Sequence, residues 1–357
     1  MNHFVYRGKK VLVTGHTGFK GSWLITWLVG LSAEVYGYGL DPAGVSLYEI
    51  LQPSLARDER GDVRDRARLT KVLDEIRPDI VFHLAAQALV GTSYENPLDT
   101  VTSNVVGTAN LLECLRELPY DCHCVVVTSD KCYLNREWEY AYRENDHLGG
   151  RDVYSASKAA AEIVTAAWTA SFFQGRGGVV TARGGNVIGG GDFTKGRLFP
   201  DCVTALGEGN SIEVRNPASI RPWQHVLDCL GGYLRLGEWL LDGSYREVTE
   251  RSFNFGPVAE SRKSVAELVD QILTSWPGRW IDHSDPLAPH EAGRLAVSID
   301  RAGAVLGWTP TWGFADSVRE TVEWYRKYFN GASEQELRQE TLDQIERYMA
   351  ACGRTRP

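Results

Sequence analysis

A glycine-rich turn between an apolar strand and an apolar helix constrains this chain more than any other feature. Residues 10–13 form a predicted strand, and the turn that follows carries glycines at regular spacing. Gly15 permits a tight turn, Gly18 lets the backbone approach a phosphate, and Gly21 lets the next helix pack closely on the strand. A predicted helix at 22–31 offers backbone N–H groups at its amino end to a pyrophosphate. The pattern therefore predicts a dinucleotide-binding turn.

The first half of the chain alternates between short apolar runs and helix-length segments. Short apolar runs predict buried strands when helices cover both faces of a parallel sheet. We expect strands at 10–13, 34–38, 79–84, 122–128 and 178–182, and helices at 22–31, 65–76, 98–117 and 153–173. This alternation predicts an α/β fold with a Rossmann-like, doubly wound parallel sheet.

The composition of the chain changes after Gly184, where glycine and proline become frequent. We expect residues 1–183 to form the dinucleotide-binding Rossmann domain, with strand segments near 220–256 returning to it. Residues 184–357 are expected to form mainly a smaller α/β domain that binds the substrate. It would lie over the carboxyl edge of the sheet, where open α/β sheets bind ligands. A charged amphipathic segment at 333–349 predicts a surface helix.

Composition and charge exclude several classes of protein. The 357 residues carry a formal net charge of −8, which argues against a nucleic-acid partner because such proteins usually present a basic patch. The sequence has no long apolar run and no apolar signal segment near its start, so we expect neither a membrane span nor secretion. The seven cysteines are odd in number and lack zinc-site spacing. We therefore expect reduced thiols, a cytoplasmic location and no metal.

A tyrosine and a lysine stand four residues apart on the predicted helix at 153–173. A free phenol has a pKa near ~10 and is a poor base at neutral pH. Lys158 lies one helical turn from Tyr154. Its cation, together with the positive charge of an oxidised nicotinamide, favours the phenolate. We expect both side chains to contact the cofactor and Tyr154 to accept a proton from a substrate hydroxyl.

The glycine spacing together with the Tyr154-x-x-x-Lys158 motif resembles the extended short-chain dehydrogenases/reductases. The triplet Ser129-Asp130-Lys131 is similar to the catalytic stretch of nucleotide-sugar 4,6-dehydratases, and in particular of their CDP-glucose branch. This resemblance implies that Ser129 binds the C4 oxygen of the sugar and that Asp130 is the general acid for the departing C6 hydroxyl. Lys131 either removes the C5 proton as a neutral amine or stays charged and stabilises the C4 enolate.

The resemblance extends over nearly the whole chain and is weakest in about the last 25 residues. Further similar stretches occur at 137–145, 185–192, 219–226, 289–291 and 306–308. The chain departs from the family's pattern at Gly91, where we expect arginine, at Gly184, where alanine is usual, and at Phe193, where tryptophan is usual. The missing arginine leaves one cation fewer near the substrate pyrophosphate or near a partner subunit.

Further cofactor contacts are expected in the glycine-rich turn and at the ends of the neighbouring strands. They are Thr17, Phe19, Asp41, Asp62, Val63, Leu84, Ala85 and Ala86. Asp41 either binds the ribose hydroxyls or only caps a turn before Pro42, and Asp62 can accept a hydrogen bond from the adenine amine. No arginine follows closely after the second strand, which favours NAD over NADP.

The implied substrate carries two phosphates, and cations or amide donors would bind them. Arg221 is the first candidate, followed by Arg197 and Asn186, because the planar guanidinium suits phosphate recognition. Gln87, which follows the cofactor stretch, is a further expected substrate contact. His290 can touch the nucleotide ribose.

The resemblance implies one overall reaction. NAD would take hydride from C4 of CDP-glucose, water would leave across C5 and C6, and the hydride would return to C6 to give CDP-4-keto-6-deoxyglucose. It also implies a homodimer or higher homo-oligomer formed through the predicted helices at 98–117 and 153–173.

Three alternatives remain open at this point. The chain is a 4,6-dehydratase for another nucleotide-linked glucose, a nucleotide-sugar 4-epimerase, or a non-catalytic redox-sensing or scaffold protein on the same fold. Epimerisation eliminates no water, so Asp130 and Lys131 argue against the epimerase. A scaffold protein would not need Ser129, Tyr154 and Lys158 together, which argues against the last alternative.

Overall fold

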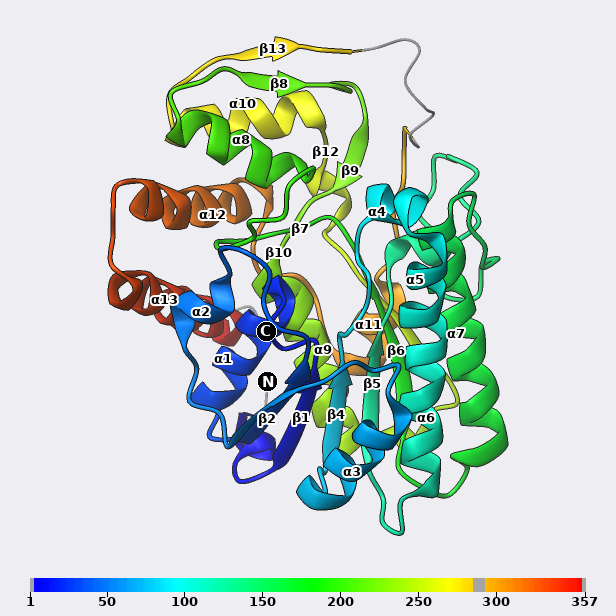
Figure 1. Cartoon of the computed structure of the whole chain (residues 1–357). Helices are drawn as coiled ribbons and strands as arrows, with labels where there is room; N and C mark the ends of the chain where they lie inside the picture. Colours follow the sequence, from blue (N-terminus) through cyan, green and yellow to red (C-terminus); the bar gives the residue numbers. More distant parts are fainter. Residues whose placement is uncertain (1–2, 285–292, 355–357) are drawn as a thin grey trace.

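The computed structural model describes residues 3–284 and 293–354 (Figure 1). Its centre is a seven-stranded sheet in the order β11-β6-β5-β4-β1-β2-β3, and every neighbouring pair in it runs parallel. The strands are β1 (Lys10–Thr14), β2 (Glu34–Gly39), β3 (Arg57–Arg60), β4 (Ile80–His83), β5 (His123–Val127), β6 (Val179–Gly184) and β11 (Ser252–Phe255). The α/β class and the doubly wound parallel sheet are confirmed.

Successive residues of the strands face two different layers of helices. On one face, Val11 and Val13 pack with the helices α1 (Phe19–Gly30) and α9 (Val226–Leu241). On the other face, Leu12 packs with α3 (Arg66–Ile76) and α6 (Gly107–Glu117), and α7 (Val153–Phe172) lies beside α6. Both faces of the sheet are therefore buried, as its apolar strands predict.

The helix expected at 98–117 is interrupted. It consists of α5 (Pro97–Val101), a π-helical turn at Thr102–Val106 and α6, and a short helix α4 (Val90–Glu95) precedes it. Single π-helical turns often occur at functional sites. The turn carries Asn104, whose side chain is buried and donates hydrogen bonds to the carbonyl of Gln87 and to Ser157. Sequence periodicity does not show these distant partners.

A second layer lies above the carboxyl ends of the strands (Figure 1). It contains the helices α8 (Leu198–Gly207) and α10 (Val265–Ser275) and three two-stranded sheets. These sheets pair β7 (Val187–Ile188) with β10 (Gln224–His225), β8 (Ile212–Val214) with β13 (Trp280–Asp282), and β9 (Ile220–Pro222) with β12 (Arg262–Ser264). Of the segments near 220–256, only β11 enters the main sheet.

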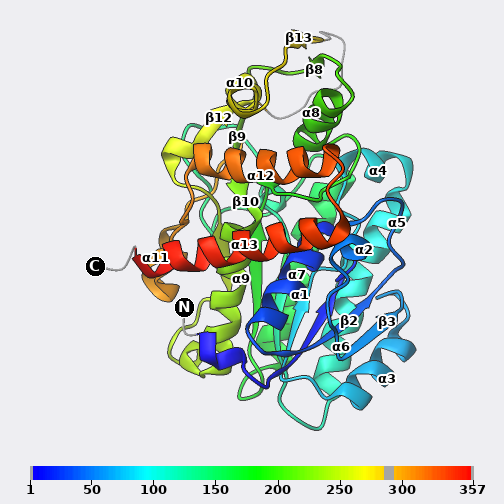
Figure 2. The ribbon, with the colours of Figure 1, turned by 90° about the vertical axis from the view of Figure 1, so that its left-hand side faces the viewer.

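The last two helices bind the molecule together along one side. The helix α13 (Glu334–Arg354) runs across α1 and α9 in Figure 2, and α12 (Phe314–Phe329) lies above it, between α13 and α10. Tyr348 of α13 is fully buried, and its hydroxyl donates to the buried carboxyl of Asp228 at 2.9 Å. The remaining helices are α2 (Leu47–Leu51) and α11 (Asp300–Leu306). No helix in the described ranges is long and apolar enough to cross a membrane.

Candidate functional site

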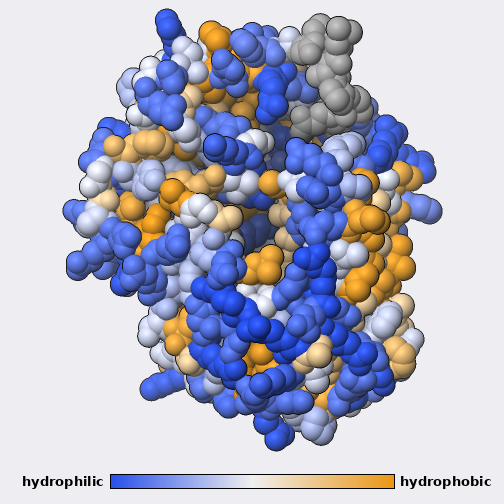
Figure 3. Space-filling model, viewed as in Figure 1, coloured by the Kyte–Doolittle hydropathy of each residue, from blue (hydrophilic) through white to orange (hydrophobic). Residues whose placement is uncertain are grey.

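The glycine-rich turn lies at the carboxyl edge of the sheet, where the space-filling surface is hollowed between the two layers (Figure 3). Gly15 has a φ of +72°, a conformation that glycine adopts without strain. A side chain there would meet the backbone nitrogen of Ala85 at 2.6 Å, so the turn lies directly against the segment after β4. The hydroxyl of Thr17 donates to the carbonyl of Leu40 at 2.9 Å and holds the turn against the end of β2.

The acidic residues expected at the ribose (Asp41) and at the adenine (Asp62) each pair with an arginine. The side chain of Asp41 is 84% exposed and pairs with Arg60 at 3.0 Å. Asp62 pairs with Arg64 at 2.5 Å, and hydrogen bonds from Arg64 lower the pKa of Asp62. No arginine follows β2 closely in sequence, yet Arg60 lies beside Asp41 because β3 is the parallel neighbour of β2.

Sequence reasoning missed a buried histidine beneath the same turn. His16 is fully buried, and its Nε2 lies 2.8 Å from a carboxylate oxygen of Asp58 and 2.9 Å from Arg60. Burial lowers the pKa of His16. The available signal was the position of His16 inside the glycine-rich turn, where a large side chain has to pack against neighbouring residues.

The stretch after β4 is tied to the helix α7. The backbone N–H of Gln87 donates to the side chain of Asn104 at 2.8 Å, and Asn104 donates in turn to Ser157 at 2.9 Å. The side-chain amide of Gln87 donates to the carbonyl of Leu89 and to Thr100, at 2.9 Å each. Both amide hydrogens of Gln87 are therefore used in hydrogen bonds within the protein, whereas the sequence analysis expected this side chain to contact the substrate.

Three buried side chains come together at the carboxyl end of β5: Ser129 and Asp130, which follow this strand, and Tyr154 of α7. The hydroxyl of Ser129 donates to Oδ1 of Asp130 at 3.0 Å and accepts the backbone N–H of Lys131 at 3.2 Å. The side chain of Ser129 also acts on the phenol of Tyr154, whose pKa it lowers. Lys131 is partly exposed. The hydroxyl, carboxyl and phenol predicted from sequence thus converge at the carboxyl edge of the sheet.

The helix α7 presents its tyrosine and lysine from its first turns. Asp152 caps the helix by accepting the backbone N–H of Ser155 at 2.8 Å. Tyr154 and Lys158 follow on one face and are both buried. The ammonium of Lys158 donates to the carbonyl of Val127 at 3.4 Å, so the backbone of β5 fixes the position of the cation.

Burial shifts the pKa of both groups. It raises the pKa of Tyr154 to about 12, and the neighbouring Ser129 side chain opposes this rise. It lowers the pKa of Lys158 to about 8, with a further lowering from the charge of Lys20. The chain's own residues therefore do not make the phenol acidic, because desolvation outweighs the lowering of its pKa by Ser129 and by the charge of Arg197.

A buried ionic network between β6 and α7 was missed by the sequence analysis. Arg183 of β6 pairs with Glu162 of α7 at 2.7 Å, and their side chains are only 4% and 2% exposed. Glu162 also accepts hydrogen bonds from the hydroxyls of Thr128 and Thr181. Arg183 donates further to Tyr133 at 2.8 Å. The available signal was an arginine and a glutamate inside otherwise apolar segments.

The expected phosphate-binding residues come from the upper layer. Arg197 is partly buried, pairs with Asp192 at 2.8 Å, and its charge acts on the Tyr154 phenol. Arg221 lies on β9, and its guanidinium donates to the carbonyl of Ile220 at 3.0 Å. Asn186 has its amide on Asp130, at 2.9 Å from Oδ2. His290 lies outside the described residues.

The three departures from the family's pattern have different surroundings. Gly91 is exposed on α4, and a side chain there would meet nothing within 4 Å. At Gly184, an added methyl group would lie 3.0 Å from the sulfur of Cys229. Phe193 packs among the aromatic rings of α12, with its ring centre 5.0 Å from that of Tyr328. Gly91 therefore leaves open space for a larger side chain, whereas the space at Gly184 is tight.

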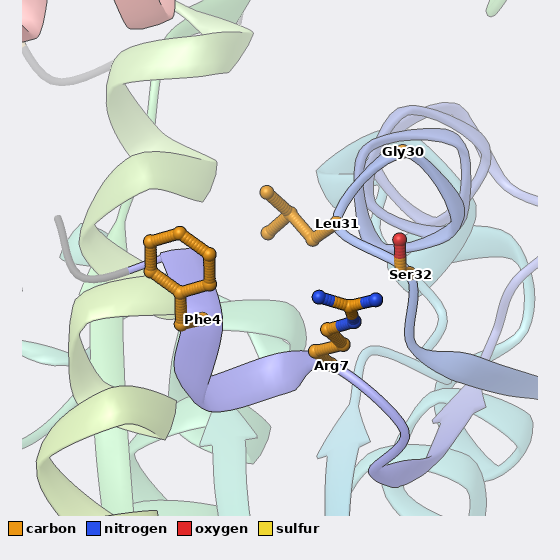
Figure 4. Close-up of a pocket in the computed structure, with 5 residues that line it drawn as sticks. All are labelled: Phe4, Arg7, Gly30, Leu31 and Ser32. Carbon is orange, nitrogen blue, oxygen red and sulfur yellow. The ribbon is translucent and has the colours of Figure 1, made fainter.

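A separate hollow lies far from the carboxyl edge, between the first turn of the chain and the end of α1 (Figure 4). It has a volume of about 190 Å³ and is lined by Phe4, Arg7, Gly30, Leu31 and Ser32. This volume is below the usual range for ligand pockets. Its lining offers a single cation and no acid–base pair, so the hollow does not compete with the site described above.

Comparison with known proteins places the chain among nucleotide-sugar enzymes. A family described as GDP-mannose 4,6 dehydratase matches residues 12–321. The chain is 44% identical to the CDP-glucose 4,6-dehydratase of Salmonella typhimurium, over 91% of this chain and 93% of that one. It is 28% identical to a UDP-glucose 4-epimerase of Mycoplasma pneumoniae, over 90% and 98% of the two chains.

The fold is also that of a solved dehydratase. The structure of dTDP-glucose 4,6-dehydratase from Bacillus anthracis, in complex with NAD, matches with a TM-score of 0.75 at 22% identity. The match covers 92% of this chain and all of the other. At this level of identity the likeness shows a shared fold.

Proposed function

The chain belongs to the GDP-mannose 4,6-dehydratase family, and from this premise we propose that it converts CDP-glucose to CDP-4-keto-6-deoxyglucose. The observation that supports CDP-glucose as the substrate is the 44% identity, over 91% of the chain, to a CDP-glucose 4,6-dehydratase. The convergence of Ser129, Asp130 and Tyr154 at the sheet edge supports the chemistry. A hydroxyl holder, an acid and a phenol together suit oxidation followed by loss of water.

The residues around the glycine-rich turn fit NAD. The amino end of α1 has no side-chain cap at Gly18, so its backbone N–H groups can bind a pyrophosphate. When bound, NAD supplies an acceptor for the hydride of C4 and later a hydride donor for C6. The residues that would hold it are Gly15, Thr17, Gly18, Phe19, Gly21, Asp41, Asp62, Val63, Leu84, Ala85, Ala86, Tyr154 and Lys158.

The proton transfers fall to the buried groups. Tyr154 takes the proton of the C4 hydroxyl while Ser129 holds the C4 oxygen by a hydrogen bond. A ketone at C4 makes the C5 proton acidic, and Asp130 gives a proton to the C6 hydroxyl as it leaves as water. Lys131 either takes the C5 proton or stabilises the enolate by its charge.

The upper layer is proposed to hold the nucleotide sugar. Arg197 and Arg221 come from residues 184–357, and both carry the guanidinium that suits phosphate. We assign the dinucleotide to residues 1–183 and the sugar nucleotide mainly to the remainder, with Gln87 and His290 as further contacts.

A homodimer or higher homo-oligomer is proposed through α5 and α7. Large apolar side chains are exposed there, among them Leu98 at 79%, Ile163 at 58% and Phe172 at 44%, and Figure 3 shows an apolar patch over these helices. Contiguous exposed apolar surface commonly marks a protein interface. No disulfide joins any of the seven cysteines, which all lie in the described residues; this supports the reducing cytoplasm as the compartment.

A substrate screen tests this function. The purified protein is incubated with CDP-, dTDP-, GDP- and UDP-glucose, with and without added NAD, and the products are weighed by mass spectrometry. We expect loss of one water and a 4-keto chromophore in alkali with CDP-glucose above the others. A product of unchanged mass would make the chain an epimerase, and no product from any of the four would reject the proposal.

A further inference from the structure

The turn that follows β6 is shaped around the carboxyl group of Asp130. Asn186 has a φ of +51°, in the left-handed region that asparagine tolerates better than most residues. In this conformation its side-chain amide donates to Oδ2 of Asp130 at 2.9 Å. The hydroxyl of Ser129 donates to the other oxygen, Oδ1, at 3.0 Å. Each carboxyl oxygen of Asp130 thus has one donor of its own.

The backbone beside Asn186 lies close against the same carboxyl group. A methyl group added at Gly185 would lie 2.0 Å from Oδ1 of Asp130 and 2.2 Å from its carboxyl carbon. The carboxyl therefore occupies the space that a side chain at position 185 would take. Asp130 is itself only 2% exposed.

A buried glutamine holds this turn in place. The side chain of Gln224 donates to the carbonyl of Gly185 at 2.9 Å and to that of Phe255 at 3.0 Å. Its backbone N–H donates to the carbonyl of Asn186 at 3.2 Å. The pairing of β10 with β7 continues this contact. The turn at Gly185 and Asn186 is thus tied to β10 by hydrogen bonds from Gln224, and through the same side chain to β11.

We propose that Asn186 is a positioning residue that confines the transferable proton of Asp130 to Oδ1. An amide N–H can only donate, so an oxygen that receives it does not present a proton there. A hydroxyl can donate or accept, so Ser129 tolerates a proton on Oδ1. Oδ1 is also the oxygen next to Ser129, which is proposed to hold the C4 oxygen, so it faces the end of the sugar that carries C4, C5 and C6. This role rests on the proposed dehydration.

The proposal differs from a direct contact between Asn186 and the substrate phosphates. A phosphate contact acts on substrate binding and leaves the order of chemical steps unchanged. A residue that places the acid acts on water loss, which follows oxidation at C4. Its loss therefore lets the oxidised sugar and reduced NAD accumulate on the enzyme, and reduced NAD absorbs in the near ultraviolet.

The test uses Asn186→Gly, because glycine adopts positive φ freely and the fold keeps its turn. The matched control is Ser32→Gly, which makes the same kind of change at a φ of +61° far from the site. Thermal unfolding without substrate checks that both variants are folded. Each protein is then mixed rapidly with CDP-glucose while reduced NAD is followed by absorbance, and kcat and KM are measured separately.

We expect Asn186→Gly to lower kcat about tenfold to a hundredfold, as a misplaced catalytic group does. KM should stay within about twofold, and reduced NAD should accumulate in the first turnover. Asn186→Asp, which keeps the shape but loses the donor, should show the same accumulation. Ser32→Gly should behave as the wild type.

Two results would overturn the inference. A raised KM with unchanged kcat and no accumulation would make Asn186 a substrate ligand. Wild-type behaviour of Asn186→Asp would show that the N–H donor is not needed. If instead the wild-type protein itself reduces NAD but releases no dehydrated product, the proposed function fails in the wild-type arm and this inference fails with it.

Discussion

The two ends of the proposed cofactor site are built on opposite principles. At the end that would hold the nicotinamide, Asp130, Tyr154 and Lys158 are buried, and burial shifts the pKa of the phenol to about 12 and that of the ammonium to about 8. At the ribose end, the side chain of Asp41 is 84% exposed and pairs with Arg60.

The difference follows from what each end has to do. A group that transfers protons gains from a dry surrounding, because burial and neighbours can shift its pKa strongly. A group that only holds hydroxyls keeps its charge most readily in water, where an ion pair contributes little. We therefore expect substitutions to have large effects at the buried end and small effects at the exposed end.

The largest effect is expected for Tyr154→Phe. Removal of a general base typically lowers a rate by about a hundredfold to ten-thousandfold, and we expect a fall in kcat of that size while the protein stays folded. Steady-state kinetics with CDP-glucose measures it. Tyr140→Phe, at a tyrosine that is 60% exposed, is the control. A kcat of Tyr154→Phe within threefold of the wild-type value would contradict the large effects expected at the buried end of the site.

Next comes the buried pair behind the catalytic helix. Glu162→Gln leaves Arg183 charged and unpaired, which we expect to lower the free energy of unfolding by about 3–5 kcal/mol. The exposed pair Arg66–Glu117 is the control, because Glu117→Gln should cost less than about 1 kcal/mol. Denaturant unfolding measures both. Equal losses would show that burial does not separate the two pairs.

A smaller effect is expected from the titration of Lys158. Its folded-state pKa is about 8 against a usual value of 10.5, so the unfolded chain binds more protons between these values. The contribution of Lys158 to stability therefore rises with pH across that window, by on the order of 1–3 kcal/mol.

Thermal unfolding at several pH values compares the wild type with Lys158→Met. The midpoint of the wild type should gain on that of the variant from about pH 8 upward, because the variant lacks the titrating group. Parallel curves for the two proteins would contradict the burial of this ammonium.

The smallest effect is expected for Asp41→Asn. An exposed ion pair contributes at most about 1 kcal/mol, so the melting temperature should hardly change, and the Kd for NAD should rise less than about tenfold. Calorimetric titration with NAD and a thermal melt measure the two quantities. A loss of NAD binding beyond about a hundredfold would make the exposed end as demanding as the buried one.

Local patterns in the sequence predicted the frame of this molecule. The glycine turn around Gly15, the parallel sheet and the helix that carries Tyr154 and Lys158 each depend on residues close together in the chain. Strand and helix periodicity report burial on one element at a time. The order of the elements then limits the possible topologies.

The parts that sequence did not predict depend on which elements become neighbours. Arg60 meets Asp41 only because β3 lies next to β2, and Glu162 meets Arg183 only because α7 covers β6. Asn186 was predicted as a phosphate ligand, whereas its amide lies on Asp130. The break of the helix at 98–117 carries Asn104, whose partners lie on other segments.

The late strand β11 has a consequence for how the protein is made. β6 ends at Gly184, but its outer neighbour begins only at Ser252, so a nascent chain that ends between them presents an open strand edge. Such edges recruit strands from other molecules. Asn254 of β11 also accepts a hydrogen bond from the hydroxyl of Tyr133 at 2.7 Å, so β11 contacts the segment that follows Asp130. We therefore expect residues 1–183 expressed alone to associate with one another, because they lack the strand that covers this edge.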